Sequence, residues 1–152
     1  MEKRFLALVV ALLVAAACNK PQFNPIGNWE VSFTIDLRFV DDDLFAPSSA
    51  KTITVPRKAT DRLGYGGLIL SQDVHGQFRA FDLACPHEAL RDVKVELDGI
   101  LVKCPKCGSV YDLSQGFGNR MSGKSDYDLK RYEVTPPDGM GMCRVYNPGY
   151  GY

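Results

Sequence analysis

Four metal-binding side chains gather in two short segments of this 152-residue chain. The first segment, Cys85-Pro86-His87, has a Cys-x-His pattern, and the second, from Cys104 to Cys107, has a Cys-x-x-Cys pattern. Sixteen residues separate His87 from Cys104. Thiolates and imidazoles are ligands that suit iron–sulfur clusters and zinc ions. The two patterns therefore predict one metal centre held by two loops.

The segments around these loops are typical of short β-strands. Residues 30–40 alternate strictly between apolar and polar side chains, which predicts a half-buried strand. Asp98-Gly99 is a hairpin signal between the two ligand segments, so we expect it to bring them together. His75-Gly76 is a second such signal. We expect an all-β fold, with further strands at 51–55, 67–71, 78–83, 93–97, 100–102, 110–113, 129–134 and 142–146.

The N-terminus is typical of an export signal. A charged start is followed by an apolar run over residues 5–17, which is too short to span a bilayer of about 30 Å. Three alanines then precede Cys18, a pattern that resembles a bacterial lipobox. We expect a signal peptide at 1–17, a tether at 18–28 attached through lipidated Cys18, and a domain at 29–152. Ordinary secretion with an incidental Cys18 is the alternative. The expected location is the bacterial cell envelope, at a membrane and facing the periplasm or the cell surface.

The composition argues against a nucleic-acid partner. Lys and Arg together number 18, as do Asp and Glu, so the formal net charge is zero. Binding to phosphates needs a basic surface. Asp41-Asp42-Asp43 is the one acidic run, which we interpret as a solvated turn, with a calcium site as a remote alternative.

The residues that flank the ligand patterns resemble those of the Rieske 2Fe–2S domain. The resemblance covers about 66–134 and is carried by three stretches, residues 81–87, 98–105 and 108–112, the last reading Gly-Ser-Val-Tyr-Asp. It implies a Rieske-like antiparallel β-sandwich with a small two-loop subdomain that binds the cluster. It also implies that hydroxyls of Ser109 and Tyr111 donate hydrogen bonds to cluster sulfurs.

The sequence departs from the Rieske pattern at Cys107, where the family has its second histidine. Rieske centres place two Cys on one iron and two His on the other. By position, the resemblance implies that Cys85 and Cys104 bind the inner iron and that His87 and Cys107 bind the outer one. Because thiolate carries a charge that imidazole lacks, we expect a potential below most Rieske centres. We also expect one redox-linked ionisation of a ligand imidazole rather than two.

Two other interpretations of the cysteines stay open. Three Cys and one His also suit a structural zinc ion, which makes a zinc-stabilised binding lipoprotein the main alternative. A metal-free domain with a disulfide such as Cys107–Cys143 is the other. Cys143 also fits a buried hydrophobic position in a late strand.

An iron–sulfur domain of this size is expected to pass single electrons rather than to catalyse a reaction alone. A mononuclear iron site needs two further His and a carboxylate, and only His75 remains. No dinucleotide-binding fingerprint is present. We therefore expect an electron-transfer component of an oxidoreductase system, with a redox partner protein. The candidates for its docking surface are Glu88, Lys106 and Lys124.

Overall fold

The alternating segment near the N-terminus forms strand β1 (Val31–Asp36), with alternate residues buried and exposed as expected. The strand ends earlier than the pattern predicts. The N–H groups of Val40 and Asp41 both donate to the carbonyl of Asp36, at 3.2 and 2.7 Å. This turn directs Phe39 and Val40 into solvent, where they are 72% and 52% exposed.

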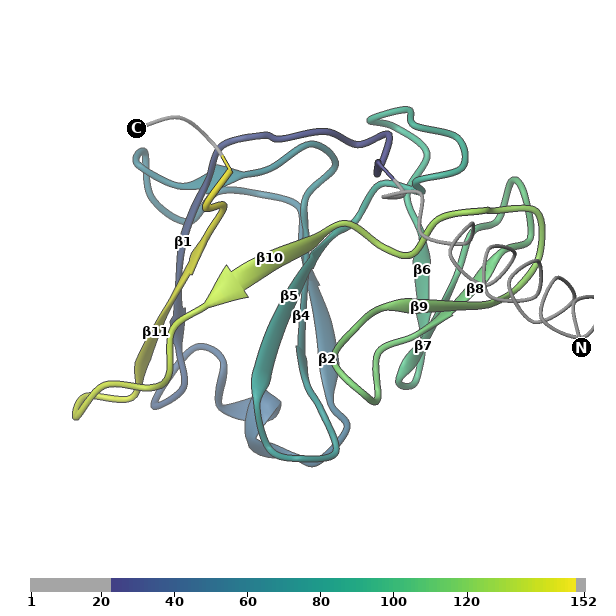
Figure 1. The fold of residues 1–152 in the computed structure, drawn as a ribbon. Helices are drawn as coiled ribbons and strands as arrows, with labels where there is room; N and C mark the ends of the chain where they lie inside the picture. Colours follow the sequence, from purple (N-terminus) through teal and green to yellow (C-terminus); the bar gives the residue numbers. More distant parts are fainter. Residues whose placement is uncertain (1–22, 150–152) are drawn as a thin grey trace, which may run out of the picture.

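A computed structural model describes residues 23–149, and these residues contain no α-helix. Their one helical turn is the 3₁₀ helix η1 (Asp42–Phe45). Seven strands form an antiparallel sheet in the order β2-β4-β5-β10-β11-β1-β3 (Figure 1). Besides β1, they are β2 (Ala50–Ile53), β3 (Arg62–Leu63), β4 (Leu68–Gln72), β5 (Phe78–Asp82), β10 (Arg131–Val134) and β11 (Met142–Tyr146).

A second, four-stranded antiparallel sheet has the order β6-β7-β8-β9. Its strands are β6 (Glu96–Asp98), β7 (Leu101–Lys103), β8 (Val110–Asp112) and β9 (Asn119–Ser122). The predicted turn at Asp98-Gly99 joins β6 to β7, and Gly99 has the positive φ of 64° that such a turn requires. The smaller sheet lies at one end of the molecule, beside the larger one (Figure 1).

The fold has two hydrophobic cores. The first core includes Phe33, Ile35 and Val145, and it contains Cys143. The second core lies between β5 and the smaller sheet, and it contains Cys85, Cys104 and Cys107. The cysteines of the predicted metal centre therefore share one core, and Cys143 belongs to the other.

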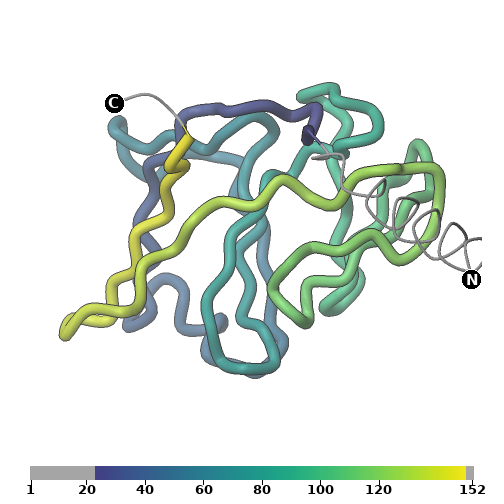
Figure 2. The backbone as a smooth tube through the Cα atoms, in the orientation of Figure 1, coloured from purple at the N-terminus to yellow at the C-terminus, as the bar shows by residue number. Residues whose placement is uncertain are grey.

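The chain before β1 packs on the domain. Ile26 is 2% exposed, the side-chain amide of Asn24 donates to the carbonyl of Asp128 at 2.8 Å, and Lys130 donates to Asn28 at 2.8 Å. Figure 2 shows this segment running along one edge of the molecule from β1 toward the smaller sheet. The part of the predicted tether that the structure describes is thus in contact with the fold.

The predicted signal peptide and Cys18 lie outside residues 23–149. Across the described part of the chain, no helix is both long and apolar enough to span a membrane.

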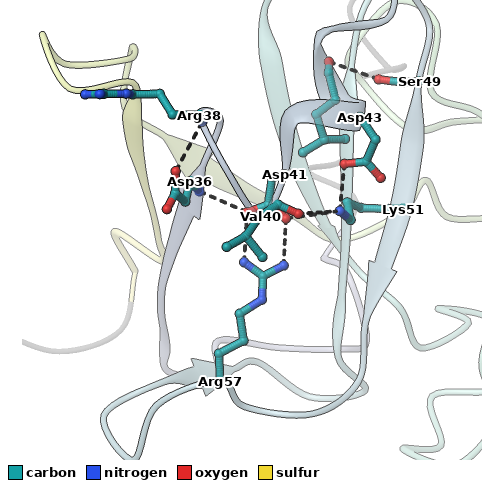
Figure 3. A network of polar contacts seen from close by, with 9 residues as sticks. Asp36, Arg38, Val40, Asp41, Asp43, Ser49, Lys51 and Arg57 are labelled. Atoms are coloured by element: carbon teal, nitrogen blue, oxygen red, sulfur yellow. Dashed lines mark hydrogen bonds and ion pairs between the residues drawn. The ribbon is translucent and has the colours of Figure 1, made fainter.

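The acidic run at residues 41–43 is not a fully solvated turn. The Asp41 side chain is fully buried, and Arg57 donates to both of its carboxylate oxygens at 2.8 and 2.6 Å (Figure 3). Lys51 lies 3.2 Å from Asp41 and 2.7 Å from Asp43. The N–H of Asp36 also donates to Asp41, at 2.9 Å. The buried carboxylate is therefore neutralised by two cations and joins the end of β1 to β2.

Candidate metal centre

The first ligand loop leaves the end of β5 and carries Cys85. The N–H of Cys85 donates to the carbonyl of Val93 at 2.9 Å, and the N–H of Ala89 donates to the carbonyl of Cys85 at 2.9 Å. Ala89 has a φ of 50°, a left-handed conformation that costs a non-glycine residue roughly 1–2 kcal/mol. Such strain persists only where surrounding contacts impose it, so this loop is tightly constrained.

The outer side of the first loop rests on aromatic rings. The Tyr65 hydroxyl donates to the carbonyl of Ala89 at 3.2 Å. The Arg91 guanidinium lies 5.0 Å from the ring centre of Trp29 and 5.1 Å from that of Tyr65. These contacts connect the loop to the segment before β1 and to the chain between β3 and β4.

The second ligand loop joins β7 to β8 and carries Cys104 and Cys107. The N–H of Cys104 donates to the carbonyl of Ser109 at 2.8 Å, and the N–H of Gly108 donates to the carbonyl of Cys104 at 2.9 Å. Gly108 has a φ of 72°, which explains a glycine directly after the second cysteine. The loop is thus a tight turn that points both thiols the same way.

The two loops bring three cysteine sulfurs together. The Sγ atoms of Cys85, Cys104 and Cys107 all lie within 4.8 Å of one another. Those of Cys85 and Cys107 are 3.6 Å apart. Cys85 and Cys104 are fully buried, and Cys107 is 8% exposed. Three convergent buried thiols are a donor set for a soft metal ion or an iron–sulfur cluster.

His87 is exposed and does not belong to this group of three sulfurs. It lies two residues after Cys85, on the outside of the first loop. The chemistry of the donors fits a 2Fe–2S cluster in which three Cys and one outer His are the ligands. Of these four residues, His87 is the exposed one and would be the ligand nearest to solvent.

Hydroxyl groups lie beside two of the sulfurs, as the Rieske resemblance implies. The Ser109 Oγ is 3.2 Å from the Cys107 Sγ, and the Tyr111 hydroxyl is 3.7 Å from the Cys85 Sγ. Both side chains are fully buried. The N–H of Ser125 donates to the Ser109 Oγ at 2.8 Å, which leaves the Ser109 hydrogen free for the sulfur once that sulfur is deprotonated.

The surroundings shift the pKa values of the thiols in opposite directions. Burial raises the pKa of Cys85 to about 12. Burial also opposes ionisation of Cys107, but the hydroxyl and N–H of Ser109 outweigh it and hold the pKa of Cys107 below its ordinary value. Of these two thiols, Cys107 is the one whose anion the protein stabilises better.

Asp82 anchors the start of the first loop, a role that the sequence alone did not reveal. Its fully buried carboxylate accepts from the N–H groups of Tyr65, Gly66 and Ala84 at 2.7, 3.0 and 2.8 Å. It also accepts from the Tyr132 hydroxyl at 2.7 Å. Burial raises the pKa of Asp82 despite these bonds. The one signal for this role in the sequence was the position of Asp82, three residues before Cys85.

Two glycines allow neighbouring segments to approach the site closely. A Cβ on Gly66 would lie 2.7 Å from the backbone N of Ala84, next to Cys85. A Cβ on Gly123 would overlap with the Cα of Ser109. The chain before β4 and the chain after β9 therefore enclose the ligand loops from two sides.

Cys143 is a buried free thiol in the core of the larger sheet. Cys107 is also free, and it lies in the other core. The structure thus contradicts a Cys107–Cys143 disulfide and agrees with Cys143 as a buried hydrophobic residue. Burial raises the pKa of Cys143 to about 11, which makes it a poor nucleophile.

Of the three residues expected at a docking surface, two pair with each other. The Lys106 Nζ lies 2.8 Å from a carboxylate oxygen of Glu88, so an ion pair links the two ligand loops. Lys124 is exposed. Glu88 and Lys106 therefore connect the loops, whether or not a partner also contacts them.

Comparison with known proteins identifies the fold. Neither a protein-family model nor a curated protein matches the chain. Among solved structures, the apo form of a quaternary ammonium Rieske monooxygenase is similar over 84% of this chain, with a TM-score of 0.52 and 14% identity. The chain spans 35% of that monooxygenase.

Two smaller proteins give lower structural scores. A ferredoxin of Sphingomonas yanoikuyae B1 matches 70% of this chain and 94% of its own, with 21% identity and a TM-score of 0.43. A chain from the complex of reduced oxygenase and oxidised ferredoxin in carbazole 1,9a-dioxygenase matches 67% and 83%, with 23% identity and a TM-score of 0.43. From the topology and the likeness to the monooxygenase, the described residues have the all-β, Rieske-like fold that the sequence predicts.

Proposed function

We propose that this protein is a one-electron carrier that binds a Rieske-like 2Fe–2S cluster through Cys85, His87, Cys104 and Cys107. One observation carries the proposal: three buried cysteines converge from two loops of a Rieske-like fold. A bound 2Fe–2S cluster supplies reversible transfer of single electrons. The loops hold the inner ligands in a dry core, while exposed His87 provides the exit toward a redox partner protein.

The ligand set determines the sign of the expected potential shift. The Cys107 thiolate adds a negative charge where the family has a neutral imidazole, and this favours the oxidised state. The hydroxyls of Ser109 and Tyr111 oppose the shift because they stabilise negative charge on the sulfurs. We expect a midpoint between the roughly −150 to +300 mV of Rieske centres and the roughly −400 mV of plant-type ferredoxins.

The proposed location is a membrane surface in the cell envelope. The apolar run at 5–17 and the cysteine at position 18 support an exported, lipid-anchored protein. Mass spectrometry of the mature protein tests this directly. Acyl chains on Cys18 are the expected result, and an unmodified Cys18 contradicts the anchor.

Anaerobic purification with an absorption spectrum and metal analysis tests the function. We expect a red-brown protein with two irons per chain and visible absorption that bleaches on reduction. A colourless protein with one zinc favours the zinc-stabilised alternative, and a metal-free protein contradicts both. A midpoint above about +100 mV would exclude the expected effect of Cys107.

The variant Cys107→His is the sharpest test of the ligand set. It restores two imidazoles, so we expect a more Rieske-like spectrum, a higher potential and two redox-linked ionisations in place of one. Cys143→Ser is the matched control, because it removes a buried thiol from the other core. An unchanged potential in Cys107→His would show that Cys107 is not a ligand.

A further inference from the structure

The spacing of the three sulfurs matches ligands of a single ion. Thiolates at about 2.3 Å from one tetrahedral metal lie about 3.8 Å from each other. The Cys85 and Cys107 sulfurs are 3.6 Å apart, and Cys104 lies within 4.8 Å of both. Sulfurs on different irons of a cluster lie further apart, because bridging sulfides separate the irons. In the two-iron arrangement, Cys85 and Cys107 belong to different irons, so the Cys107 sulfur would have to move outward.

The number of donors selects the kind of ion. No His, Asp or Glu within residues 23–149 joins the three sulfurs. Structural zinc sites have four protein ligands. Thiolates select soft ions such as Cu(I), which is stable with three sulfur ligands.

The environment of the sulfurs offsets the charge that such a site would carry. Three thiolates and one Cu(I) sum to a charge of −2 in a buried place. The Tyr111 hydroxyl lies 3.7 Å from the sulfur of Cys85 and can donate to its thiolate. The Ser109 Oγ lies 3.2 Å from the sulfur of Cys107, and its hydroxyl can donate to that sulfur once the thiol is deprotonated. Hydrogen bonds to charged groups are stronger than those between neutral groups, so these hydroxyls stabilise a buried thiolate on each loop.

We propose that Cys85, Cys104 and Cys107 also bind one Cu(I) ion through three sulfurs, without His87, in competition with cluster loading. Binding exchanges three S–H bonds for three Cu–S bonds and releases three protons, with no electron transfer. The proposal uses three of the ligands of the proposed function but does not depend on the fourth.

The experiment is an anaerobic titration of the full mature chain and its variants with Cu(I) held by the chromophoric chelator bicinchoninate. In His87→Ala, which the proposed function predicts to lack the cluster, we expect one Cu(I) per chain. X-ray absorption should give three sulfur neighbours and no nitrogen.

In the background of His87→Ala, adding Cys104→Ser or Cys107→Ser should weaken Cu(I) binding more than about 100-fold. Cys107→Ser, at a slightly exposed position, keeps the test valid if Cys104→Ser does not fold. Adding Cys143→Ser should change affinity less than about threefold.

The cluster-loaded protein gives a second measurement. Added Cu(I) should bleach its visible absorption and release two irons and two sulfides for each copper that replaces a cluster. Absence of Cu(I) binding to His87→Ala, or a nitrogen ligand in the spectrum of the copper-loaded wild-type protein, would overturn the proposal. A wild-type protein that never binds iron but binds Cu(I) through three sulfurs would refute the proposed function alone.

Discussion

The hydroxyl of Ser109 has two partners and serves the site through both. It accepts from the N–H of Ser125 and lies 3.2 Å from the Cys107 sulfur. Because the first bond occupies a lone pair, it also sets the direction of the hydroxyl hydrogen. Ser109 is thus held as a donor to the Cys107 thiolate, in the conformation that would raise the potential of a bound cluster.

Replacing Ser109 by Ala should lower the midpoint potential. If the hydrogen bond from Ser109 to the Cys107 sulfur favours the reduced state by about 1.4 kcal/mol, its loss lowers the one-electron midpoint potential by about 60 mV. Redox titration of the loaded protein measures it. Ser122→Ala is the control, since Ser122 is an exposed serine of β9 and its removal should leave the potential unchanged. Equal potentials in wild type and Ser109→Ala would exclude this role for the hydroxyl.

At the scale of elements, the chain before β4 touches the first ligand loop so closely that no side chain fits between them. Gly66 donates its N–H to Asp82 at 3.0 Å, and a Cβ at Gly66 would overlap with Ala84. The position of Cys85 thus depends on a segment about twenty residues away in the sequence. Asp82 joins the same two segments, because it accepts from N–H groups of both.

Gly66→Ala should therefore destabilise the protein by about 2–3 kcal/mol and reduce metal occupancy. Denaturant unfolding and metal analysis of the same preparation measure the two effects. Gly139→Ala is the control, because a Cβ there meets nothing within 4 Å and the residue has no positive φ. If Gly66→Ala were as stable as Gly139→Ala, close packing at Ala84 would not position the loop.

The buried Asp41 carboxylate should make the stability of the folded protein depend on pH. Burial opposes ionisation of Asp41, but hydrogen bonds from Arg57, Asp36 and Lys51 outweigh it and lower the pKa of Asp41. A lowered pKa in the folded state adds stability above the ordinary Asp pKa of about 3.9. That contribution is lost as the pH falls through the lowered pKa.

Asp41→Asn should cost stability near the lower end of about 3–5 kcal/mol at neutral pH, because Arg57 and Lys51 are partly exposed. The difference from wild type should shrink as the pH falls below about 3.9. Unfolding measured at pH 7 and at acid pH checks both. A difference that stays constant with pH would mean that the Asp41 charge does not contribute.

At the scale of the whole molecule, the segment before β1 acts as part of the domain. Ile26 is buried. Asn24 donates to the carbonyl of Asp128, and Asn28 accepts from Lys130; both partners lie between β9 and β10. The segment therefore connects β1 of the larger sheet to the chain between β9 and β10. An anchor at Cys18 would be separated from packed Asn24 by only five residues, which span at most about 20 Å.

Ile26→Ala should destabilise the whole domain by about 2–4 kcal/mol, because it removes a buried side chain. Thermal or denaturant unfolding measures it as a single transition. Phe23→Ala, at an 80% exposed position in the same segment, should stay within about 0.5 kcal/mol. Equal stabilities of the two variants would show that the segment is a free tether.

Much of the element pattern could be predicted because it depends on local signals. Alternation and Asp/Gly turns predicted an all-β fold and the Asp98-Gly99 hairpin. The strand predicted at 30–40 was too long, because Asp41 turns the chain after Asp36 and is itself held by Arg57, sixteen residues away. Strands β3 and β9 were missed because they are short and mostly exposed, so neither has a strong apolar pattern.

The sequence by itself determined the donor chemistry, because Cys and His carry their ligand properties wherever they lie. It also determined the Cys107 substitution and hence the predicted sign of the potential shift. Only the tertiary structure decided that three sulfurs meet while His87 stays outside, that Cys143 lies apart, and that Asp82, Gly66 and Ser125 hold the loops. The physical reason is distance along the chain. The contacts of Gly66 with Asp82, of Cys85 with Cys107 and of Ser109 with Ser125 join residues 16–22 positions apart, and only the packing of the fold brings such groups within bonding range.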